Sequence, residues 1–540
     1  MKKNVIKNLM FLIIIIISYY FMLPPININS PFFWSFVIFF LILYLVISIS
    51  TNLLTVFPDI ILNNKKTVNS ISRYLNPSQK IIVLIIGVII IGIFLINIYV
   101  SPVFSASKYS TRIYVQSDND FISDIPMIEH NRLPVIDKAS TQRLGDRVMG
   151  RMPEFVSQFR VSDLYTQINY QNEIVRVTPL EYEDFFKFLA NRKEGITGYI
   201  MVNSVTGKAD LIRLEQGMKY MDSAILNKNL DRKLRFSYPT KIFGDKSFEI
   251  DEEGNPYWIV PTIKYVGVGV RPEVEGVIIL NPINGESDYY KVEDVPEWVD
   301  HVYPSWLIID QVNSWGVYQR GFLNSLFSQR NVVVTTEGYN YTVYNDDVYL
   351  YTGITSVVAD ESNIGFIMTN LRTKNTNFYE APGAEEYSAM DSAEGQVQQM
   401  NYRATFPLLI NVNNKPTYFI SLKDNAGLVK MYAFVDVVDY QKVVVTDAAL
   451  GIEKALVNYI GNKVDTGEIE TKTITVQEIK TAIIKGDTHY FIIDENQNIY
   501  RANIAVNQGL LIFLEKGEKV EIVYRTGVSP YEINKITLDN

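Results

Sequence analysis

The residues that first suggest chemistry lie in GVIILNPINGESDYY, Gly276–Tyr290. Asn281, Asn284 and Asp288 crowd between two apolar runs, and such a cluster could hold a cation, cradle a phosphate or turn the chain. A calcium loop needs six to eight oxygens with several carboxylates, and this stretch has only two. Gly285 stands where a tight hairpin loop needs positive φ. The sequence therefore predicts a β-hairpin and no metal site here.

A second copy of this stretch supports the hairpin. Residues 198–214 (GYIMVNSVTGKADLIRL) align without a gap to residues 276–292 (GVIILNPINGESDYYKV), at an offset of 78. Both copies predict a strand, a polar turn and a second strand. The identical pairs are Gly198/Gly276, Ile200/Ile278, Asn203/Asn281, Gly207/Gly285 and Asp210/Asp288.

Carboxylates gather between positions 360 and 394, with Arg372 among them. A pair of carboxylates can act as acid and base in glycoside hydrolysis. A solvated loop and helix face would carry the same residues. Both interpretations stay open from the sequence for Asp360, Glu361, Glu385, Glu386, Asp391 and Glu394.

Other catalytic signatures are weak. The three histidines, His130, His301 and His489, lie in separate segments and form no HExxH or His-x-x-His pair. Ser105–Lys108 fits an SxxK pattern but lacks the companion SDN and KTG motifs. No GxSxG, Walker A or dinucleotide motif occurs. The sequence thus predicts no catalytic residue, no cofactor and no metal, and a protein that is not an enzyme.

Two aromatic segments also have alternative explanations. DVPEWVD, Asp294–Asp300, places Trp298 between carboxylates, which suits either a sugar-binding edge or an ordinary loop. Pro304–Phe327 predicts a helix with an aromatic stripe, which suits either the core or a helix on the outer leaflet.

Composition limits the class of protein. The chain has 540 residues and no Cys, which excludes disulfides, Fe–S clusters and thiol catalysis. Residues 102–540 carry 43 Lys and Arg against 58 Asp and Glu, a net charge of −15. An acidic surface repels nucleic acid, so the sequence predicts no nucleic-acid partner.

Three apolar stretches occupy the first part of the chain, and none carries an ionisable side chain except Asp59 beyond the second. They run over about residues 9–23, 32–57 and 81–100, lengths that suit helices crossing a bilayer. Lys2, Lys3 and Lys7 precede the first, and Lys65, Lys66, Arg73 and Lys80 lie between the second and third. The positive-inside rule places both segments in the cytoplasm. A cleaved signal peptide is less favoured, because no small-residue cleavage pattern follows the first stretch.

The remaining sequence predicts β-rich modules with a few helices. Expected helices are 180–191, 304–327, 383–399 and 448–460. Expected C-terminal strands are 473–484, 489–494, 499–505, 510–514, 519–525 and 532–537, which suggest a small barrel of OB or SH3 type. The fold class is thus a membrane-anchored α+β protein, with three transmembrane helices (1–101), α+β modules at 102–235, 236–330 and 331–442, and a barrel-like domain at 443–540.

The hairpins 198–214 and 276–292, with the helix-then-strands order of 384–440, resemble PepSY-type extracytoplasmic modules of bacterial membrane proteins. The resemblance implies a non-catalytic binding or inhibitory module outside the membrane. It carries over no active-site residue.

Location and architecture together predict a multi-pass cell-membrane protein with residues 102–540 outside. The expected function is a non-enzymatic scaffold or binding protein of the bacterial envelope, with a role in cell shape or wall assembly as a hypothesis. Its expected partners are the bilayer, through three helices, and a protein or wall polymer outside. The alternatives are an envelope hydrolase using the carboxylates of 360–394, and a subunit of a larger membrane complex.

Overall fold

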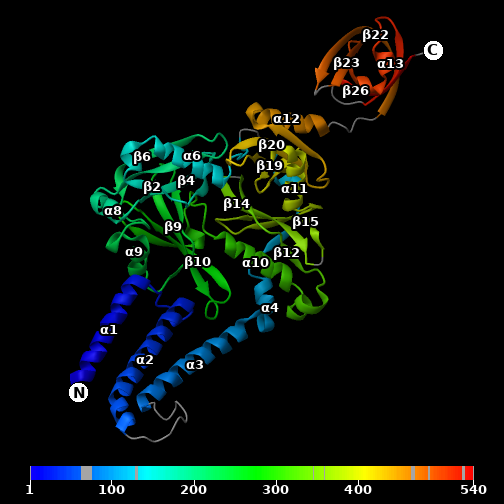
Figure 1. Ribbon diagram of the computed structural model, residues 1–540. Coiled ribbons are helices and arrows are strands. Elements are labelled where there is room, and N and C mark those ends of the chain that lie inside the picture. Colours follow the sequence, from blue (N-terminus) through cyan, green and yellow to red (C-terminus); the bar gives the residue numbers. More distant parts are fainter. Residues whose placement is uncertain are drawn as a thin grey trace. The chain divides into compact units, whose positions relative to one another are not determined.

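The computed structural model describes residues 2–538 apart from 63–75, 128–131, 345, 358, 464–468, 485–486 and 526–529. The chain forms two compact units. The first comprises residues 1–430 with 435–443, and the second comprises 431–434 with 444–540. Figure 1 gives the element labels used below.

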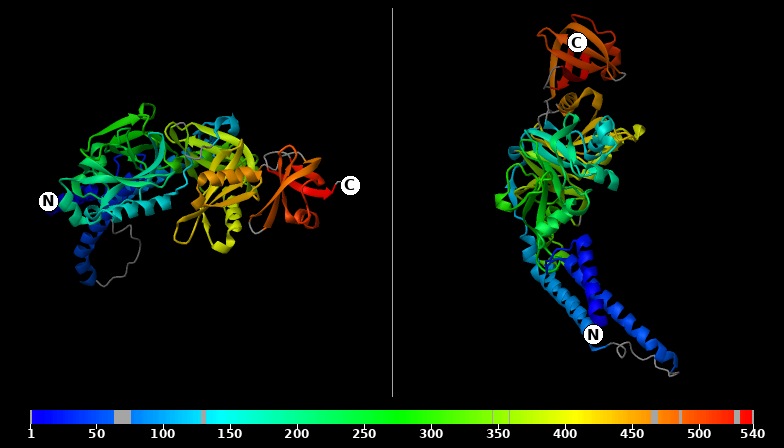
Figure 2. Two further views of the ribbon diagram at one scale, coloured as in Figure 1. Left: turned by 90° about the horizontal axis from the view of Figure 1, so that it is seen from above. Right: turned by 90° about the vertical axis from the view of Figure 1, so that its left-hand side faces the viewer.

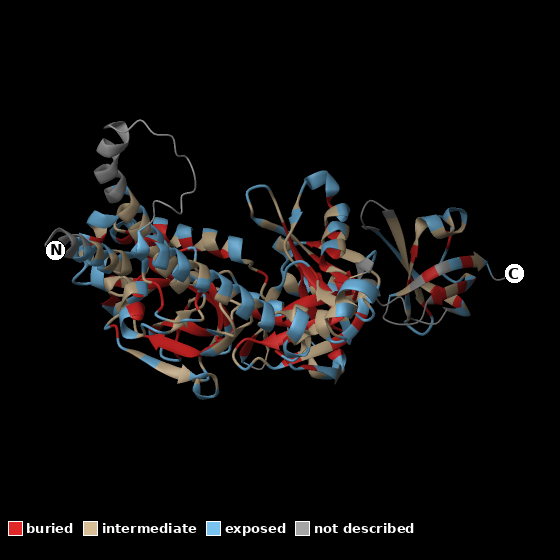
Figure 3. Cartoon of the chain, turned by 90° about the horizontal axis from the view of Figure 1, so that it is seen from below, coloured by how far each residue is buried: buried red, intermediate tan, exposed pale blue. Residues whose placement is uncertain are grey.

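The first unit begins with three apolar helices, α1 (Lys2–Met22), α2 (Pro31–Leu62) and α3 (Pro77–Val100). Among the described residues, two helical segments are long and apolar enough to cross a membrane, Pro31–Ser50 and Pro77–Val100. The apolar part of α1, Asn8–Met22, is shorter. The full set of three predicted spans is therefore not established by length. In Figure 3 these helices are largely exposed or intermediate, whereas buried residues concentrate in the strands.

A seam of hydrogen bonds joins the ends of these helices to the β-rich part, and we call it the anchor seam (residues 20–30 and 97 against 232–241 and 265–269). Arg235 is 5% exposed and donates from Nε to the Leu23 carbonyl at 3.0 Å and from Nη1 to the Lys241 carbonyl at 2.6 Å. Burial lowers its pKa to about 10. Asn97, in the last turn of α3, donates to the Val268 carbonyl at 3.0 Å and accepts from the Val268 N–H at 2.9 Å.

The β-rich part repeats one topology. In each of three sheets, five consecutive strands form a set, in which the first two strands both pair with the long third strand. The fourth strand pairs with the third strand, and the fifth strand pairs with the fourth. A helix precedes each set: α6 (Lys138–Gly150), α9 (Leu230–Ser237) and α10 (Ser305–Tyr318). The strands are β2 (Phe159–Val161), β3 (Thr166–Tyr170), β4 (Glu173–Tyr182), β5 (Ile196–Asn203), β6 (Ala209–Met218); β7 (Ile242–Phe243), β8 (Ser247–Ile250), β9 (Pro256–Tyr265), β10 (Pro272–Leu280), β11 (Ser287–Lys291); and β12 (Val333–Thr335), β13 (Asn340–Tyr344), β14 (Asp347–Ser356), β15 (Ala359–Asn370), β16 (Thr376–Ala384).

A fourth set starts in the same way. After α11 (Glu386–Gln396), both β17 (Arg403–Ala404) and β18 (Leu408–Val412) pair with β19 (Lys415–Lys423). Short elements join the sets, and β1 lies parallel to β16 in the third sheet. The remaining elements of this stretch are α4 (Pro102–Ser110), β1 (Val115–Asn119), α5 (Phe121–Asp124), α7 (Pro153–Val156), α8 (Phe185–Asn191), β20 (Val429–Asp436) and β21 (Val443–Asp447).

The predicted hairpins are confirmed, and a third copy joins them. Asn203 Oδ1 accepts from the Thr206 N–H at 2.8 Å, and Asn281 Oδ1 accepts from the Ile283 N–H at 2.8 Å. The β15–β16 turn is built alike, because Asn370 Oδ1 accepts from the Thr373 N–H at 2.9 Å. Its positive-φ position is held by Lys374 (φ 64°) instead of glycine. An Asx turn fixes all three corners.

The second sheet is buried on both faces. Side chains alternate along a strand, so Trp258 and Ile278 enter the core shared with the first sheet, while Ile259 and Val277 enter the core shared with α10 and the third sheet. A strand buried on both sides becomes a continuous apolar run, and GVIIL of β10 is buried throughout. The second sheet therefore links two cores.

Two sequence-based helix boundaries were wrong. The segment 180–191 is a strand up to Tyr182, and the helix starts only after Asp184, whose side chain accepts from two N–H groups of the first turn. The helix at 304–327 ends at Tyr318, and a π-helical turn, Asn324–Ser328, follows.

The segment predicted as a strand at 510–514 belongs to the second unit and is helical. Asn507 caps the short helix α13 (Gln508–Leu511) by accepting from the Leu510 N–H at 3.2 Å, and Leu511 enters the barrel core. The apolar residues here therefore follow a helical turn and not the alternation of a strand.

The second unit contains α12 (Ile452–Lys463) and a closed barrel, visible in both views of Figure 2. The long strand β22 pairs with β25 over its first half and with β23 over its second half. The strands are β22 (Ile469–Ile484), β23 (Asp487–Asp494), β24 (Ile499–Asn503), β25 (Lys519–Arg525) and β26 (Tyr531–Leu538), in the order β22-β23-β24-β26-β25.

The anchor seam predicts a stability effect for Arg235→Met. The substitution removes the donor from the partly buried carbonyls of Leu23 and Lys241, and losing hydrogen bonds to a charged group costs about 2–3 kcal/mol. We expect thermal unfolding of the purified chain in detergent to begin at lower temperature. Arg213→Met serves as control, because Arg213 is 61% exposed and pairs with Glu154 at the surface. Equal melting temperatures for the two variants would contradict the role of Arg235.

Candidate functional site

The carboxylates of 360–394 do not converge on one cleft in the described structure. Glu386 is fully buried and accepts from the Gly353 N–H at 2.8 Å, and burial raises its pKa. Glu394 accepts from the Ala404 N–H at 2.8 Å and pairs with Arg403 at 3.0 Å. Both carboxylates have local hydrogen-bond partners. The side chains of Asp360 and Glu361 lie outside the described residues.

The remaining sequence candidates are also separate. Ser105 Oγ donates to the Tyr99 carbonyl at 3.4 Å, and Lys108 is exposed. His301 Nε2 lies 2.7 Å from the Gln167 carbonyl, which can only accept. His130 lies outside the described residues. Within the part of the chain that the structure describes, no group of three or more His, Cys, Asp or Glu is placed to hold a metal ion.

Trp298 lies at a polar cavity of about 400 Å³. Its ring centroid is 5.1 Å from that of Tyr257. Arg372, which the sequence grouped with the 360–394 carboxylates, borders the same cavity and pairs with Asp347 at 2.7 Å. Carboxylates and amides supply most of the other lining residues. Such a wall can bind a neutral, hydroxyl-rich ligand through hydrogen bonds.

A buried pair of acids lies behind this cavity. Asp300 is 2% exposed and Glu249 is fully buried. Glu249 Oε2 accepts from the Asp300 N–H at 2.8 Å, and Asp300 Oδ2 accepts from the Asn169 N–H at 2.9 Å. Burial, and then the nearby Glu249 carboxylate, raise the pKa of Asp300 well above its usual value. Burial and a neighbouring negative charge both disfavour the charged form of the Asp300 carboxyl.

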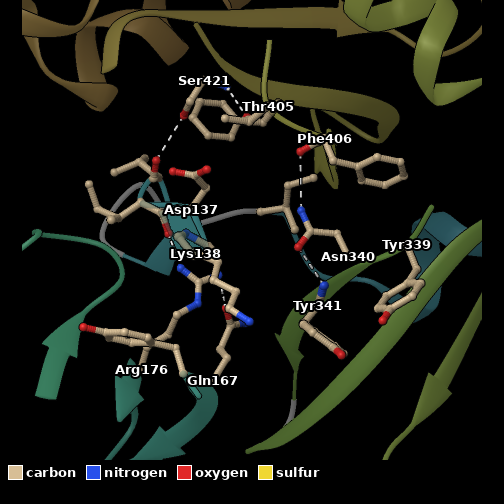
Figure 4. Close-up of a pocket in the computed structure, with 16 residues that line it drawn as sticks. Asp137, Lys138, Gln167, Arg176, Tyr339, Asn340, Tyr341, Thr405, Phe406 and Ser421 are labelled. Carbon is tan, nitrogen blue, oxygen red and sulfur yellow. Dashed lines mark hydrogen bonds between the residues drawn. The ribbon is translucent and has the colours of Figure 1, made fainter. Parts of the chain in front are cut away.

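A second cavity, of about 460 Å³, lies among the first, third and fourth β-sets (Figure 4). Arg176 of β4 borders it and is 8% exposed. The guanidinium donates to the Ile136 carbonyl, to Thr141 Oγ1 at 3.2 Å and to Gln167 Oε1 at 2.6 Å. Burial lowers the pKa of Arg176 to about 10, so the side chain remains charged at neutral pH.

Asp137, a carboxylate in the lining of this cavity, already accepts hydrogen bonds from other groups. Asp137 caps α6 by accepting from the Ser140 N–H at 3.1 Å, and its other oxygen accepts from Lys423 at 2.7 Å. These hydrogen bonds outweigh burial and lower the pKa of the Asp137 carboxyl. Lys138 adds a further cation to the lining. The Arg176 cavity is therefore net positive within an acidic chain.

Sequence reasoning did not find the Arg176 cavity. The one available signal was a cation within the apolar strand EIVRVTPLEY, where it must face the core or a partner group. Its neighbours come from positions 137, 341 and 421, which no local motif connects.

Comparisons with known proteins give no family. No family model matches the chain. No curated protein matches it either. Among solved structures, a crystal structure of the Ifi202 HINa domain in complex with 20-bp dsDNA is 12% identical, covers 25% of this chain and 90% of that chain, and has a TM-score of 0.11. A structure described as the molecular basis for abrogation of activation of pro-inflammatory cytokines is 12% identical, covers 25% of this chain and 88% of that chain, and has a TM-score of 0.10. Likenesses at these scores carry no argument.

The predicted partner set needs a correction. It excluded nucleic acid, whereas one of the matched solved structures is a domain in complex with double-stranded DNA. The exclusion is withdrawn. Its physical basis was also too coarse, because the net charge of residues 102–540 is a sum over the whole surface and does not fix what a local patch binds.

Asp300 predicts a pH-dependent stability. Between the unfolded pKa of about 4 and the higher folded value, the folded chain keeps a proton that the unfolded chain has lost, so stability falls as pH rises. Asp300→Asn has no carboxyl at this position and therefore removes this fall in stability with rising pH. We expect its melting temperature to gain on that of the parent chain as pH rises from about 5 to about 8. Asp288→Asn, at an exposed position of strand β11, controls for surface charge. Parallel pH profiles for Asp300→Asn and the parent chain would contradict the assignment.

Proposed function

We propose that this chain is a membrane-anchored, non-enzymatic scaffold or binding protein of a bacterial cell envelope, with residues 102–540 on the extracytoplasmic side. The observation that carries the proposal is the anchor seam. Arg235, Asn97 and their backbone partners hold the β-rich part against the ends of the apolar helices. A part fixed in this way is positioned at the bilayer surface, which is what a scaffold requires.

The seam supports an alternating path of three helices. The residue that follows α1, the link before α2 and the last turn of α3 all contact the β-rich part. Arg235 donates to the Leu23 carbonyl, Asn29 Nδ2 donates to the Tyr265 carbonyl at 3.1 Å, and Asn97 donates to the Val268 carbonyl. The N-terminal end of α3, at Pro77, is then on the other side. This agrees with the cationic flanks, which the positive-inside rule assigns to the cytoplasm.

A cation–π contact extends the seam into α1. The Arg232 guanidinium lies 4.3 Å from the Tyr20 ring centroid, and its Nε donates to the Tyr20 carbonyl at 3.2 Å. These contacts favour an α1 that stays in the protein as a third span, although its apolar part is short.

The modules fit a binding role. The repeated helix-plus-sheet sets are consistent with the PepSY-type resemblance of the hairpins. The barrel order, with a parallel β24–β26 pair and α13 between β24 and β25, favours an OB-type barrel over an SH3-type one. Fold type alone assigns no ligand. The non-enzymatic part of the proposal is supported by Glu386 and Glu394, whose carboxylates serve local hydrogen bonds.

The cysteine-free chain allows a direct test of topology. Asp288→Cys, at an exposed position of strand β11, should react with a membrane-impermeant maleimide in intact cells, whereas Lys3→Cys should react only after the membrane is opened. Detergent-solubilised samples of both variants, labelled in parallel, control for thiol reactivity. Labelling of Lys3→Cys in intact cells, with Asp288→Cys protected, would reverse the orientation and remove the envelope assignment.

A further inference from the structure

The Arg176 cavity holds a cation whose charge its own partners do not neutralise. The three acceptors of the guanidinium are a backbone carbonyl, a hydroxyl and an amide oxygen, all neutral. The nearest acid, Asp137, is paired with Lys423. A buried charge without an opposite charge is costly to maintain. Its retention next to a cavity is explained if an anion enters that cavity.

A second donor stands beside the guanidinium. Gln167 is 3% exposed, and its Oε1 receives a hydrogen bond from Arg176. Its Nε2 has no hydrogen-bond partner among the described residues, and Figure 4 shows it directed to the side where Asn340 and Tyr341 lie. Buried N–H donors are nearly always satisfied. An oxygen placed in the cavity would satisfy this donor.

Nine of the other fourteen lining residues are apolar or aromatic, and the remaining five are Asp137, Lys138, Asn340, Thr405 and Ser421. Phe406, Leu408 and Phe419 come from the fourth set, and Tyr339 and Tyr341 come from β13. These side chains suit a hydrocarbon or ring body, since small-molecule sites combine apolar walls with a few placed polar groups. Lys138, the other cation of the lining, is exposed, so Arg176 supplies the one buried positive charge among the lining residues. One negative charge fits the cavity better.

We propose that the Arg176 cavity binds a small monocarboxylate with an apolar or aromatic body, whose carboxylate is received by Arg176 and by Gln167 Nε2. Two adjacent N–H donors, one of them charged, match the two oxygens of a carboxylate. This inference goes beyond the scaffold proposal and does not depend on membrane orientation, because every lining residue lies in the first unit outside α1–α3.

The test uses the full chain in detergent and isothermal titration with N-acetyl-L-phenylalanine, with its primary amide as the neutral control of the same shape. We expect the acid to bind and the amide to bind at least about tenfold more weakly, because only the acid supplies the negative charge. Equal affinity for acid and amide, or no binding of the acid at about 10 mM, would overturn the proposal. Tighter binding of phenyl phosphate than of the acid would overturn the carboxylate class.

Three variants locate the site. Arg176→Gln should abolish binding of the acid, and Gln167→Met, which removes Nε2 at similar volume, should weaken it about fivefold or more. Arg160→Gln is the matched control, because this arginine is 60% exposed and pairs with Glu181 at the surface. If Arg176→Gln does not fold, Gln167→Met decides the question. Unchanged affinity in Gln167→Met would exclude this cavity as the binding site.

Discussion

The second sheet determines the architecture of the first unit, because both of its faces are buried against other elements. Trp258 and Ile278 fill one core, and Ile259 and Val277 fill the other. A shift of β10 by one residue would exchange these sets of side chains between two different environments. Register in this sheet is therefore fixed from both sides, which ties the first and third β-sets into one body. The two cavities depend on that body, since each takes its walls from more than one set.

The same body contains the buried guanidinium groups of Arg235 and Arg176, whose burial would be unfavourable without hydrogen-bond acceptors. Arg235 lies at the end of α1 with carbonyl oxygens as its partners, and Arg176 lies beside Gln167 with neutral acceptors. The first arrangement satisfies the orphan carbonyl groups where α1 ends and the chain turns. The second leaves its charge without an acid of its own. These two buried arginines thus differ in role. The hydrogen bonds of Arg235 are structural, whereas Arg176 has no acid among its hydrogen-bond partners and is the cation of the proposed binding site.

Turn chemistry made part of this fold predictable. Asn203 and Asn281, each followed four positions later by glycine, identified two hairpins that have the predicted pairing. The third hairpin was missed because Lys374 replaces the glycine, although Asn370 still directs the turn. The third copy of the hairpin was therefore not recognised from the sequence, because Lys374 stands at the glycine position. Helix ends were less predictable, since the caps at Asp184 and Asn507 override the apolar pattern on which the boundaries were based.

The candidate site was predictable only in part. Trp298, Glu297 and Asp300 border a polar cavity, which is compatible with both sequence interpretations, a sugar-binding edge and an ordinary loop. The carboxylates of 360–394 were grouped by their position along the chain. In the structure Glu386 and Glu394 accept hydrogen bonds from different backbone N–H groups, those of Gly353 and Ala404. Arg176 and Gln167 are brought together by the pairing of β3 with β4. Sequence distance contains no information on which remote segments then close the cavity.

The way the barrel closes has a consequence for the integrity of the second unit. β26 is held on both sides, parallel to β24 and antiparallel to β25. It thereby removes the unpaired backbone edges that β24 and β25 would otherwise expose to other chains. Removal of β26, by truncation before Tyr531, would open two such edges at once. The barrel would then become a template for strand exchange or aggregation between molecules.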